Sequence, residues 1–169
     1  KGTAISDNHL VSALGRCSRF EEGTLTDLSR LWNFTMREII GFGSSSYCQE
    51  KLQEIESRSL EIFQDRFGLS FNLSTASDPF FGKNQEIKRK AQLLEASKFE
   101  LRAVLPYNQS TMSVASFNRH RSVFYDRFQI QKGDEGMESF CVGFGYERIL
   151  YAILSQKGTD FSNRYYSNL

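Results

Sequence analysis

The sequence has few of the residues that build disulfide frameworks, and it lacks the long apolar runs that cross membranes. Its 169 residues include three cysteines and two prolines. An odd and sparse set of cysteines does not support a disulfide framework, so we expect a reduced, cytoplasmic protein. No apolar run approaches the roughly 20 residues that a membrane-spanning helix needs. No basic and then apolar leader opens the sequence, so we expect neither secretion nor a membrane anchor.

Neither sign of charge is in excess. Lys and Arg number 21 and Asp and Glu number 20, which gives a formal net charge of +1. A chain this neutral has no strong electrostatic attraction to nucleic acid or to an anionic membrane. Apolar residues make up 40% of the chain, and 15 of its residues are Phe. This composition excludes a disordered chain, and with no low-complexity linker we expect one domain over residues 1–169.

Period-two alternation predicts several strands. They are expected at Leu14–Phe20, Leu31–Phe42, Leu69–Leu73, Phe99–Leu105, Met112–Ile130 and Phe140–Gly145, the fifth of them long and bent. A polar loop, Glu21–Ser29, joins the first two strands as a hairpin. Because strands outnumber helices and neighbouring strands are mostly joined as hairpins, we expect an α+β fold with an antiparallel sheet flanked by helices.

Two stretches have helical spacing. The serines at Ser44–Ser46 offer an N-cap, and Ser46 with Gln49 matches a capping box. Apolar residues then recur at helical intervals, so we expect a helix over Ser46–Phe67 that Gly68 ends. A second helix is expected over Tyr146–Gln156, with Gly158 beyond its end.

One segment carries side chains that are costly to bury unless they bind something. By strand alternation Cys17, Arg19 and Glu21 share one face. The alternative interpretation is an exposed sheet face with a surface ion pair.

Two further segments suit a nucleotide. Phe34, Met36 and Glu38 share a face of the next strand, where a ring can stack on a base and a carboxylate can accept from its exocyclic amine. In Gly143–Arg148 the glycines permit close approach of a ligand. Arg148 would lie in the first turn of a helix, where a phosphate is favoured. Each segment alone also fits ordinary packing.

Together the three segments resemble the catalytic core of class II aminoacyl-tRNA synthetases. Cys17–Glu21 is similar to the second motif of that family, whose core is Arg-x-Glu followed by a loop and a strand. Phe34–Glu38 resembles the returning strand of that motif. Gly143–Arg148 resembles the third motif, which ends in an Arg that opens a helix. The resemblance implies an antiparallel sheet flanked by helices.

Finer matches narrow the resemblance to one branch. Ser97–Leu101, Ser116–Asn118 and Cys141–Gly145 resemble the amino acid:[carrier protein] ligases, which are homologues of the zinc-dependent archaeal seryl-tRNA synthetases. Asp78–Gly82 also resembles the carrier-protein branch. The resemblance implies that the protein activates a small amino acid with ATP as an aminoacyl adenylate. It would then transfer the aminoacyl group to the phosphopantetheine thiol of a carrier protein, and tRNA is not expected as a partner.

The resemblance also implies a zinc ion. The matching ligands are Cys17, Glu100 and Cys141, and two thiolates with one carboxylate make a three-ligand zinc site. The fourth position would hold the α-amino group of the substrate. Cys48, at the start of the first predicted helix, is expected to be a bystander.

The nucleotide and amino acid sites carry over in the same way. Arg19 would hold the α-phosphate and Phe34 would stack on adenine, while Arg148 would lie against the other adenine face or the γ-phosphate. Further candidates are Glu21 or Glu38 at the adenine edge, Arg30 at the β- and γ-phosphates, and Asn118 near the amino acid or the ribose. Arg30 fits an exposed loop arginine equally well, and Glu38 fits a metal or ribose contact. Mg²⁺ is implied because ATP is delivered with it.

Three hypotheses follow from these residues. The first is the carrier-protein ligase. The second is the catalytic core of a zinc-dependent seryl-type tRNA synthetase, and the third is a non-catalytic paralogue that acts as a binding module. Sixteen residues precede Cys17, too few for the first motif of the family, so we expect a fragment of a protein that is a homodimer at full length. We also expect the basic segment Lys83–Lys98 to meet an acidic helix of the carrier protein.

Overall fold

The computed structural model describes residues 8–23, 25, 27–75, 98–130 and 137–159. Its elements in chain order are β1 (His9–Ser18), β2 (Asn33–Ser44), α1 (Ser45–Leu60), η1 (Glu61–Arg66), β3 (Phe71–Thr75), β4 (Lys98–Leu105), β5 (Ser110–Arg121), α3 (Val123–Phe128), β6 (Met137–Gly145) and α4 (Tyr146–Lys157). The six strands form one antiparallel sheet in the order β1-β2-β6-β5-β4-β3, so the predicted α+β class is confirmed.

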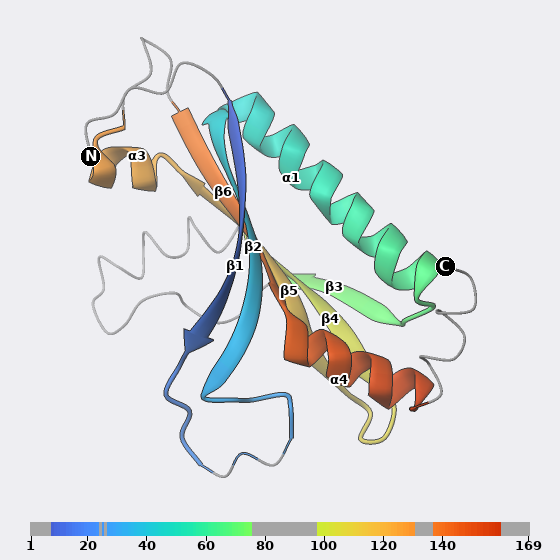
Figure 1. Ribbon diagram of the computed structural model, residues 1–169. Helices are drawn as coiled ribbons and strands as arrows, with labels where there is room; N and C mark the ends of the chain where they lie inside the picture. Colours follow the sequence, from blue (N-terminus) through green and yellow to red (C-terminus); the bar gives the residue numbers. More distant parts are fainter. Residues whose placement is uncertain (1–7, 24, 26, 76–97, 131–136, 160–169) are drawn as a thin grey trace.

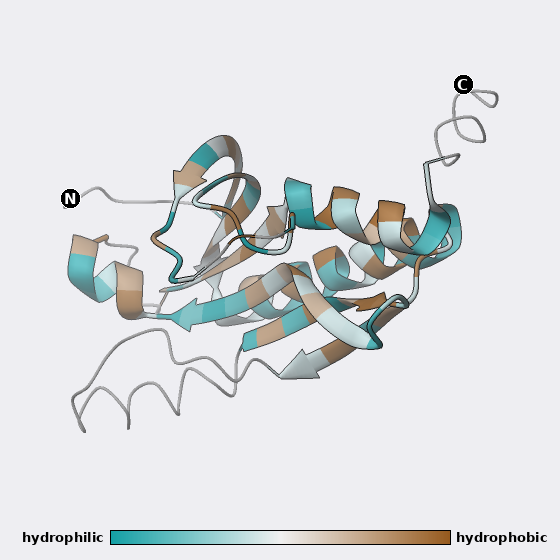
Figure 2. Cartoon of the chain, turned by 90° about the horizontal axis from the view of Figure 1, so that it is seen from below, coloured by the Kyte–Doolittle hydropathy of each residue, from teal (hydrophilic) through white to brown (hydrophobic). Residues whose placement is uncertain are grey.

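In the described residues, helices cover one face of the sheet, and the cavity described below opens on the other face. Helices α1 and α4 pack on the covered face, where Leu52 and Ala152 join Leu101, Phe117 and Val142 in a single buried core (Figure 1). Successive residues of a strand point to opposite faces, so polar residues of the same strands point the other way. Figure 2 shows this alternation as bands of hydrophilic and hydrophobic residues along the strands.

The first predicted hairpin is confirmed, with shifted bounds. Strand β1 runs over His9–Ser18 and pairs with β2, with Cys17 opposite Phe34. Arg19 therefore lies beyond the strand, although its N–H still donates to the carbonyl of Trp32 at 2.8 Å. The segment that follows, residues 19–32, is called the β1–β2 loop below.

The first predicted helix is also confirmed, with a different start. Helix α1 and the π-helical turn η1 together span residues 45–66, close to the predicted Ser46–Phe67. The N-cap is Ser44, whose hydroxyl accepts from the N–H of Tyr47 at 3.2 Å, so the predicted capping box at Ser46 is wrong. Gly68 has φ +60°, as its expected role at the helix end requires.

One strand prediction needs a larger correction. The expected long strand Met112–Ile130 ends at Arg121, and the short helix α3 follows it. Arg121 has a left-handed backbone with φ +53°, which breaks the extended run. Helix α3 places Phe124 against His120, with ring centroids 4.5 Å apart. The apolar and aromatic residues at 123–128 therefore pack as a helical turn and not as a strand.

Other bounds shift by a few residues. Strand β3 is Phe71–Thr75 where Leu69–Leu73 was expected, and β6 begins three residues before the expected Phe140. The resemblance segment Asp78–Gly82 and all of Lys83–Lys98 except Lys98 lie outside the described residues. Within the described part of the chain, no helix is both long and apolar enough to cross a membrane. The assignment of residues 1–169 to one domain stays a prediction.

Candidate active site

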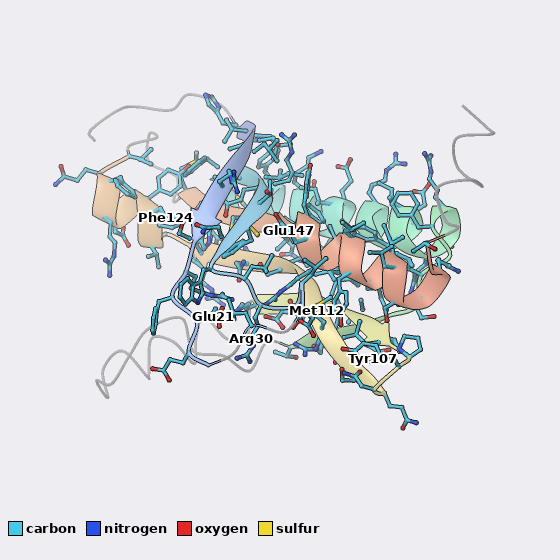
Figure 3. All side chains as sticks on the ribbon, turned by 60° about the horizontal axis from the view of Figure 1, so that its bottom comes forward. Glu21, Arg30, Tyr107, Met112, Phe124 and Glu147 are labelled. Carbon is cyan, nitrogen blue, oxygen red and sulfur yellow. The ribbon has the colours of Figure 1, made fainter. Side chains whose placement is uncertain are left out.

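A cavity of about 1040 Å³ opens on the sheet face that α1 does not cover. Its walls come from the β1–β2 loop, from β2, β4, β5 and β6, and from the first turn of α4 (Figure 3). Of the ten site residues proposed from the sequence, nine line it: Arg19, Glu21, Arg30, Phe34, Glu38, Glu100, Asn118, Cys141 and Arg148. Cys17 is the exception. The fold thus brings together residues that are more than 120 positions apart in sequence.

The charges around the cavity balance. Five basic side chains line it, namely Arg19, Arg30, Lys98, Arg102 and Arg148. Five acidic side chains line it as well, namely Glu21, Asp27, Glu38, Glu100 and Glu147. Such a mixture suits a ligand that carries both signs, for example a polyphosphate together with an ammonium group.

Arg19 lies above an aromatic ring. Its guanidinium carbon is 5.6 Å from the centroid of the Phe34 ring, within the range of a cation–π contact. Its Nε also donates to Glu21 Oε1 at 2.6 Å, and the two side chains form an ion pair. Glu21 therefore holds Arg19 in place over Phe34, at the end of the cavity where the β1–β2 hairpin closes.

Arg148 joins three parts of the structure. Its Nε donates to the carbonyl of Ser29 at 2.7 Å, and its Nη1 donates to the carbonyl of Ser113 at 3.1 Å. Burial lowers the pKa of Arg148, and the neighbouring Arg19 lowers it further. An arginine stays charged even so. The first turn of α4 is therefore fixed to the β1–β2 loop on one side and to β5 on the other.

Glu147, which sequence reasoning did not select, fixes the same turn to β2. Both of its carboxylate oxygens accept from the N–H of Thr35, each at 2.9 Å. These bonds favour the ionised form and lower the pKa of Glu147 against the opposing effect of burial. The contact fixes the position of Phe34, the residue before Thr35, relative to Arg148. The only sequence signal was a carboxylate in the first turn of a helix.

Buried polar groups mark the opposite end of the cavity. Asn118 is 8% exposed, and its Nδ2 donates to Ser116 Oγ at 3.3 Å and to Cys141 Sγ at 3.5 Å. Within the described structure, Asn118 Oδ1 is a buried acceptor without a hydrogen-bond partner. Burial raises the pKa of Cys141, and nearby Glu38 raises it further. An acceptor of this kind needs a donor from a ligand or from water.

Strand β4 contributes a row of ion-paired side chains to the end of the cavity near Asn118. Glu100 lies between Lys98 Nζ at 3.7 Å and Arg102 Nη1 at 3.0 Å, all three on β4. Arg102 also donates to the side chain and to the carbonyl of Thr111, each at 3.0 Å. Arg102 was not proposed from the sequence, where a lone arginine on a strand gave no signal.

The expected zinc ligands do not come together. Cys17 is on the edge strand β1 and Glu100 is on β4, with three strands between them. At roughly 4.8 Å per strand, about 19 Å separates the two, whereas zinc–ligand distances are about 2.0–2.3 Å. In the described residues no group of three or more His, Cys, Asp or Glu side chains is placed to hold a metal. The set Cys17, Glu100 and Cys141 therefore does not fit one zinc ion.

Comparison with known sequences places the chain among ligases. No protein-family model matches it. It is 35% identical over 136 residues to amino acid–[acyl-carrier-protein] ligase 1 of Bradyrhizobium diazoefficiens, and 32% identical over 134 residues to ligase 2 of the same organism. These matches cover 80% and 79% of this chain. Type-2 serine–tRNA ligase of Methanothermobacter thermautotrophicus is 25% identical over 150 residues, 86% of this chain. The resemblance seen in the sequence is thereby confirmed.

Solved structures confirm the fold. M. kandleri SerRS, in a crystal structure with A. aeolicus tRNASec, superposes with a TM-score of 0.78 at 20% identity. Prolyl-tRNA synthetase from Cryptosporidium parvum, complexed with L-proline and AMP, gives 0.72 at 13% identity. Each match covers 89% of this chain, and 30% and 32% of the respective neighbours. The sheet and its helices are those of a class II aminoacyl-tRNA synthetase core.

The chain is shorter than its relatives. It spans about two fifths of the length of the two carrier-protein ligases, 41% and 40%, and 28% of the Methanothermobacter serine–tRNA ligase.

Proposed function

We propose that the chain forms the catalytic core of a ligase that activates a small amino acid with ATP and loads it onto a carrier protein. The observation that carries this proposal is the position of Arg19, Phe34 and Arg148 around one cavity. They come from the end of β1, from β2 and from the first turn of α4, and they supply an aromatic ring and two cations for a nucleotide.

In this proposal the nucleotide occupies the end of the cavity near Phe34. Adenine stacks on Phe34 and takes the place of the Arg19 guanidinium, which then turns to the α-phosphate. Glu21 is the better candidate for the adenine edge. Glu38 lies four residues further along β2 than Phe34, about 13 Å away at the usual rise of a strand. Arg30 and Arg148 are left for the β- and γ-phosphates, with Mg²⁺ delivered by ATP.

The amino acid then occupies the end near Asn118. The unpaired Oδ1 of Asn118 can accept from the substrate ammonium group, and the carboxylates of Glu38 and Glu100 complement its charge. This placement leaves the substrate carboxylate directed toward the α-phosphate. The glycines at 143 and 145 allow the ligand to approach the backbone closely.

The chemistry needs little proton transfer. A carboxylate oxygen of the amino acid attacks the α-phosphorus, a new C–O–P bond forms, and pyrophosphate leaves. Negative charge increases on the phosphate oxygens, where Arg19 stabilises the transition state more than the ground state. A thiol sulfur of the acceptor then attacks the carbonyl carbon of the adenylate. A thioester forms, AMP leaves with the bonding electrons, and the thiol proton is lost to water.

The proposal also names the acceptor of the aminoacyl group, a carrier-protein thiol. Identity to the two carrier-protein ligases is 35% and 32%, against 25% to a serine–tRNA ligase, which supports a carrier-protein thiol. The near-neutral charge supports the same choice, since a tRNA acceptor is favoured by a basic surface. The tRNA-charging alternative is supported by the TM-score of 0.78 to M. kandleri SerRS. A homodimer and a reducing, cytoplasmic location stay part of the proposal, and the three free thiols are consistent with the latter.

The test measures both half-reactions on the same protein. ATP–pyrophosphate exchange is measured with glycine, alanine, serine and larger amino acids, and exchange with a small amino acid is expected. Loading is then measured on phosphopantetheinylated carrier protein and, in parallel, on total tRNA. Thioester on the carrier protein is expected. Charged tRNA without carrier loading would establish the alternative, and no exchange with any amino acid would refute adenylate formation.

A further inference from the structure

Two tyrosines and an aspartate form a hydrogen-bond chain beside the cavity. The Tyr151 hydroxyl of α4 donates to Asp27 Oδ2 in the β1–β2 loop at 3.2 Å. Since that hydroxyl has one proton, the Tyr107 hydroxyl donates to Tyr151 at 2.8 Å. Tyr107 belongs to the β4–β5 hairpin and is labelled in Figure 3. Three elements that are distant in sequence therefore meet at Asp27.

The ionised carboxylate is the end point of this chain. Hydrogen bonds from Ser29, including its N–H to Asp27 Oδ1 at 2.8 Å, and the bond from Tyr151 lower the pKa of Asp27. The hydrogen bond to Tyr107 is the main cause of a raised pKa at Tyr151, so the Tyr151 hydroxyl stays protonated at neutral pH. A chain that ends on a charge is stronger than isolated neutral hydrogen bonds.

Helix α4 holds the same short stretch of loop a second time. Arg148, one turn before Tyr151, donates to the carbonyl of Ser29. Residues three apart on a helix lie on the same side, so the two side chains contact loop residues 27 and 29 together. Asp27 and Tyr107 also form the wall between the main cavity and a second, mostly apolar hollow of about 430 Å³.

We propose that Tyr151 and Tyr107 are positioning residues that hold loop residues 27–30 at a fixed distance from α4, so that Arg30 and Arg148 oppose each other across the cavity. Two links join α4 to the loop: the Arg148 hydrogen bond to Ser29, and the chain from Tyr107 through Tyr151 to Asp27, called the tyrosine tether below. The two links respond differently when a ligand binds. A phosphate that binds Arg148 competes with the Ser29 carbonyl, whereas the tyrosine tether contacts no cavity cation and persists. The tether would then keep the loop in place while Arg148 changes partners.

The consequence for nucleotide binding rests on the proposed function, but the tether itself can be tested without a nucleotide. Trypsin cleaves after Arg30 only when the loop opens, so the rate of cleavage between Arg30 and Leu31 reports on the opening equilibrium. In the intact protein, Tyr151→Phe removes the hydroxyl at the centre of the chain. We expect cleavage at this bond to become about 3- to 10-fold faster, the range for one ordinary hydrogen bond.

Matched variants separate the tether from a general loss of stability. Tyr47→Phe removes a hydroxyl from α1, whose described residues do not line the cavity, and should leave cleavage at Arg30 unchanged. Tyr107→Phe should have a smaller effect than Tyr151→Phe, because Tyr151 can still donate to Asp27. The double variant Tyr107→Phe with Tyr151→Phe should be no faster than Tyr151→Phe alone. Cleavage in Tyr151→Phe at the wild-type rate would overturn the proposal.

Kinetics supply the second readout. In ATP–pyrophosphate exchange, Tyr151→Phe should raise the KM for ATP about 3- to 10-fold while kcat changes less, because the loop must be ordered before the phosphates bind. A fall in kcat with unchanged KM would contradict positioning. If the wild-type protein shows no exchange, the proposed function fails, and the proteolysis result still decides whether the tether exists.

Discussion

Replacement of Arg148 by alanine should abolish measurable adenylate formation while the protein stays folded. The structure fixes the Arg148 guanidinium to two elements at once, through the carbonyls of Ser29 and Ser113. Arg148 also matches the arginine of the third motif of class II aminoacyl-tRNA synthetases. The substitution therefore removes a phosphate contact and two structural hydrogen bonds, and the two effects must be measured separately.

The magnitudes differ enough to be told apart. Loss of a charged contact to the transition state is worth roughly 2–4 kcal/mol, or about 30- to 1000-fold in rate. Loss of two hydrogen bonds to backbone carbonyls costs about 1–3 kcal/mol of folding free energy, partly offset because a half-buried cation no longer needs desolvation. The stability loss alone leaves most molecules folded, so it cannot explain a 100-fold fall in rate.

The assay pairs pyrophosphate exchange with urea unfolding for wild type, Arg148→Ala and Arg148→Lys. Lysine keeps the charge but presents one compact ammonium, which cannot span Ser29 and Ser113 together. We expect Arg148→Lys to retain partial exchange activity and Arg148→Ala to retain almost none. An alanine variant with wild-type exchange would show that the nucleotide binds elsewhere, and an alanine variant that fails to fold would leave the decision to the lysine variant.

Three further predictions follow from the site and the core. Arg19→Ala should also lower exchange about 30- to 1000-fold, whereas Glu21→Gln, which keeps the shape but weakens the ion pair, should lower it less. Cys17→Ser should leave exchange and metal content at wild-type values, since Cys17 lies outside the cavity; a parallel loss of metal and activity would restore it as a ligand. Burial lowers the pKa of His120 to about 4, from an ordinary value of 6.5. The folded state therefore favours the neutral ring, and stability should fall by about 2–4 kcal/mol as the pH drops from 6.5 to 4. His120→Phe should remove this part of the pH dependence, as measured by urea unfolding across that range.

The sequence predicted the sheet well because its signals are local. The hairpin of β1 and β2, the start of α1 at a run of serines, and Gly68 with its positive φ all depend on residues within a few positions of each other. The misassigned stretch after Arg121 failed for a local reason as well. Its Phe and Tyr residues have high strand propensity, but a left-handed Arg121 and the ring contact between His120 and Phe124 accompany a turn into α3.

The cavity residues were predicted by resemblance, and their contacts were not predicted at all. Glu147 on the Thr35 N–H and Tyr151 on Asp27 each join elements far apart in the chain, and Arg102 on Thr111 joins the two strands of a hairpin. No periodicity or spacing rule signals a hydrogen bond between residues 112 or 124 positions apart. These side chains decide how the predicted arginines and the phenylalanine are oriented, so they are the part of the site that only the fold could supply.

The residues proposed for zinc match family motifs in sequence, but the geometry of the sheet keeps them apart. Cys17 and Arg19 belong to one motif, and the resemblance placed both in one site. In the structure the chain leaves β1 at Ser18, so Arg19 turns into the cavity while Cys17 stays on the edge strand. In the sheet, Cys17 and Glu100 are four strand spacings apart. A motif match fixes residue type and sequence position, but ligand sets depend on strand order and register. Arg19, Phe34 and Arg148 line one cavity because β1, β2 and the β6–α4 junction are neighbours in the sheet, and their role in nucleotide binding stays a proposal.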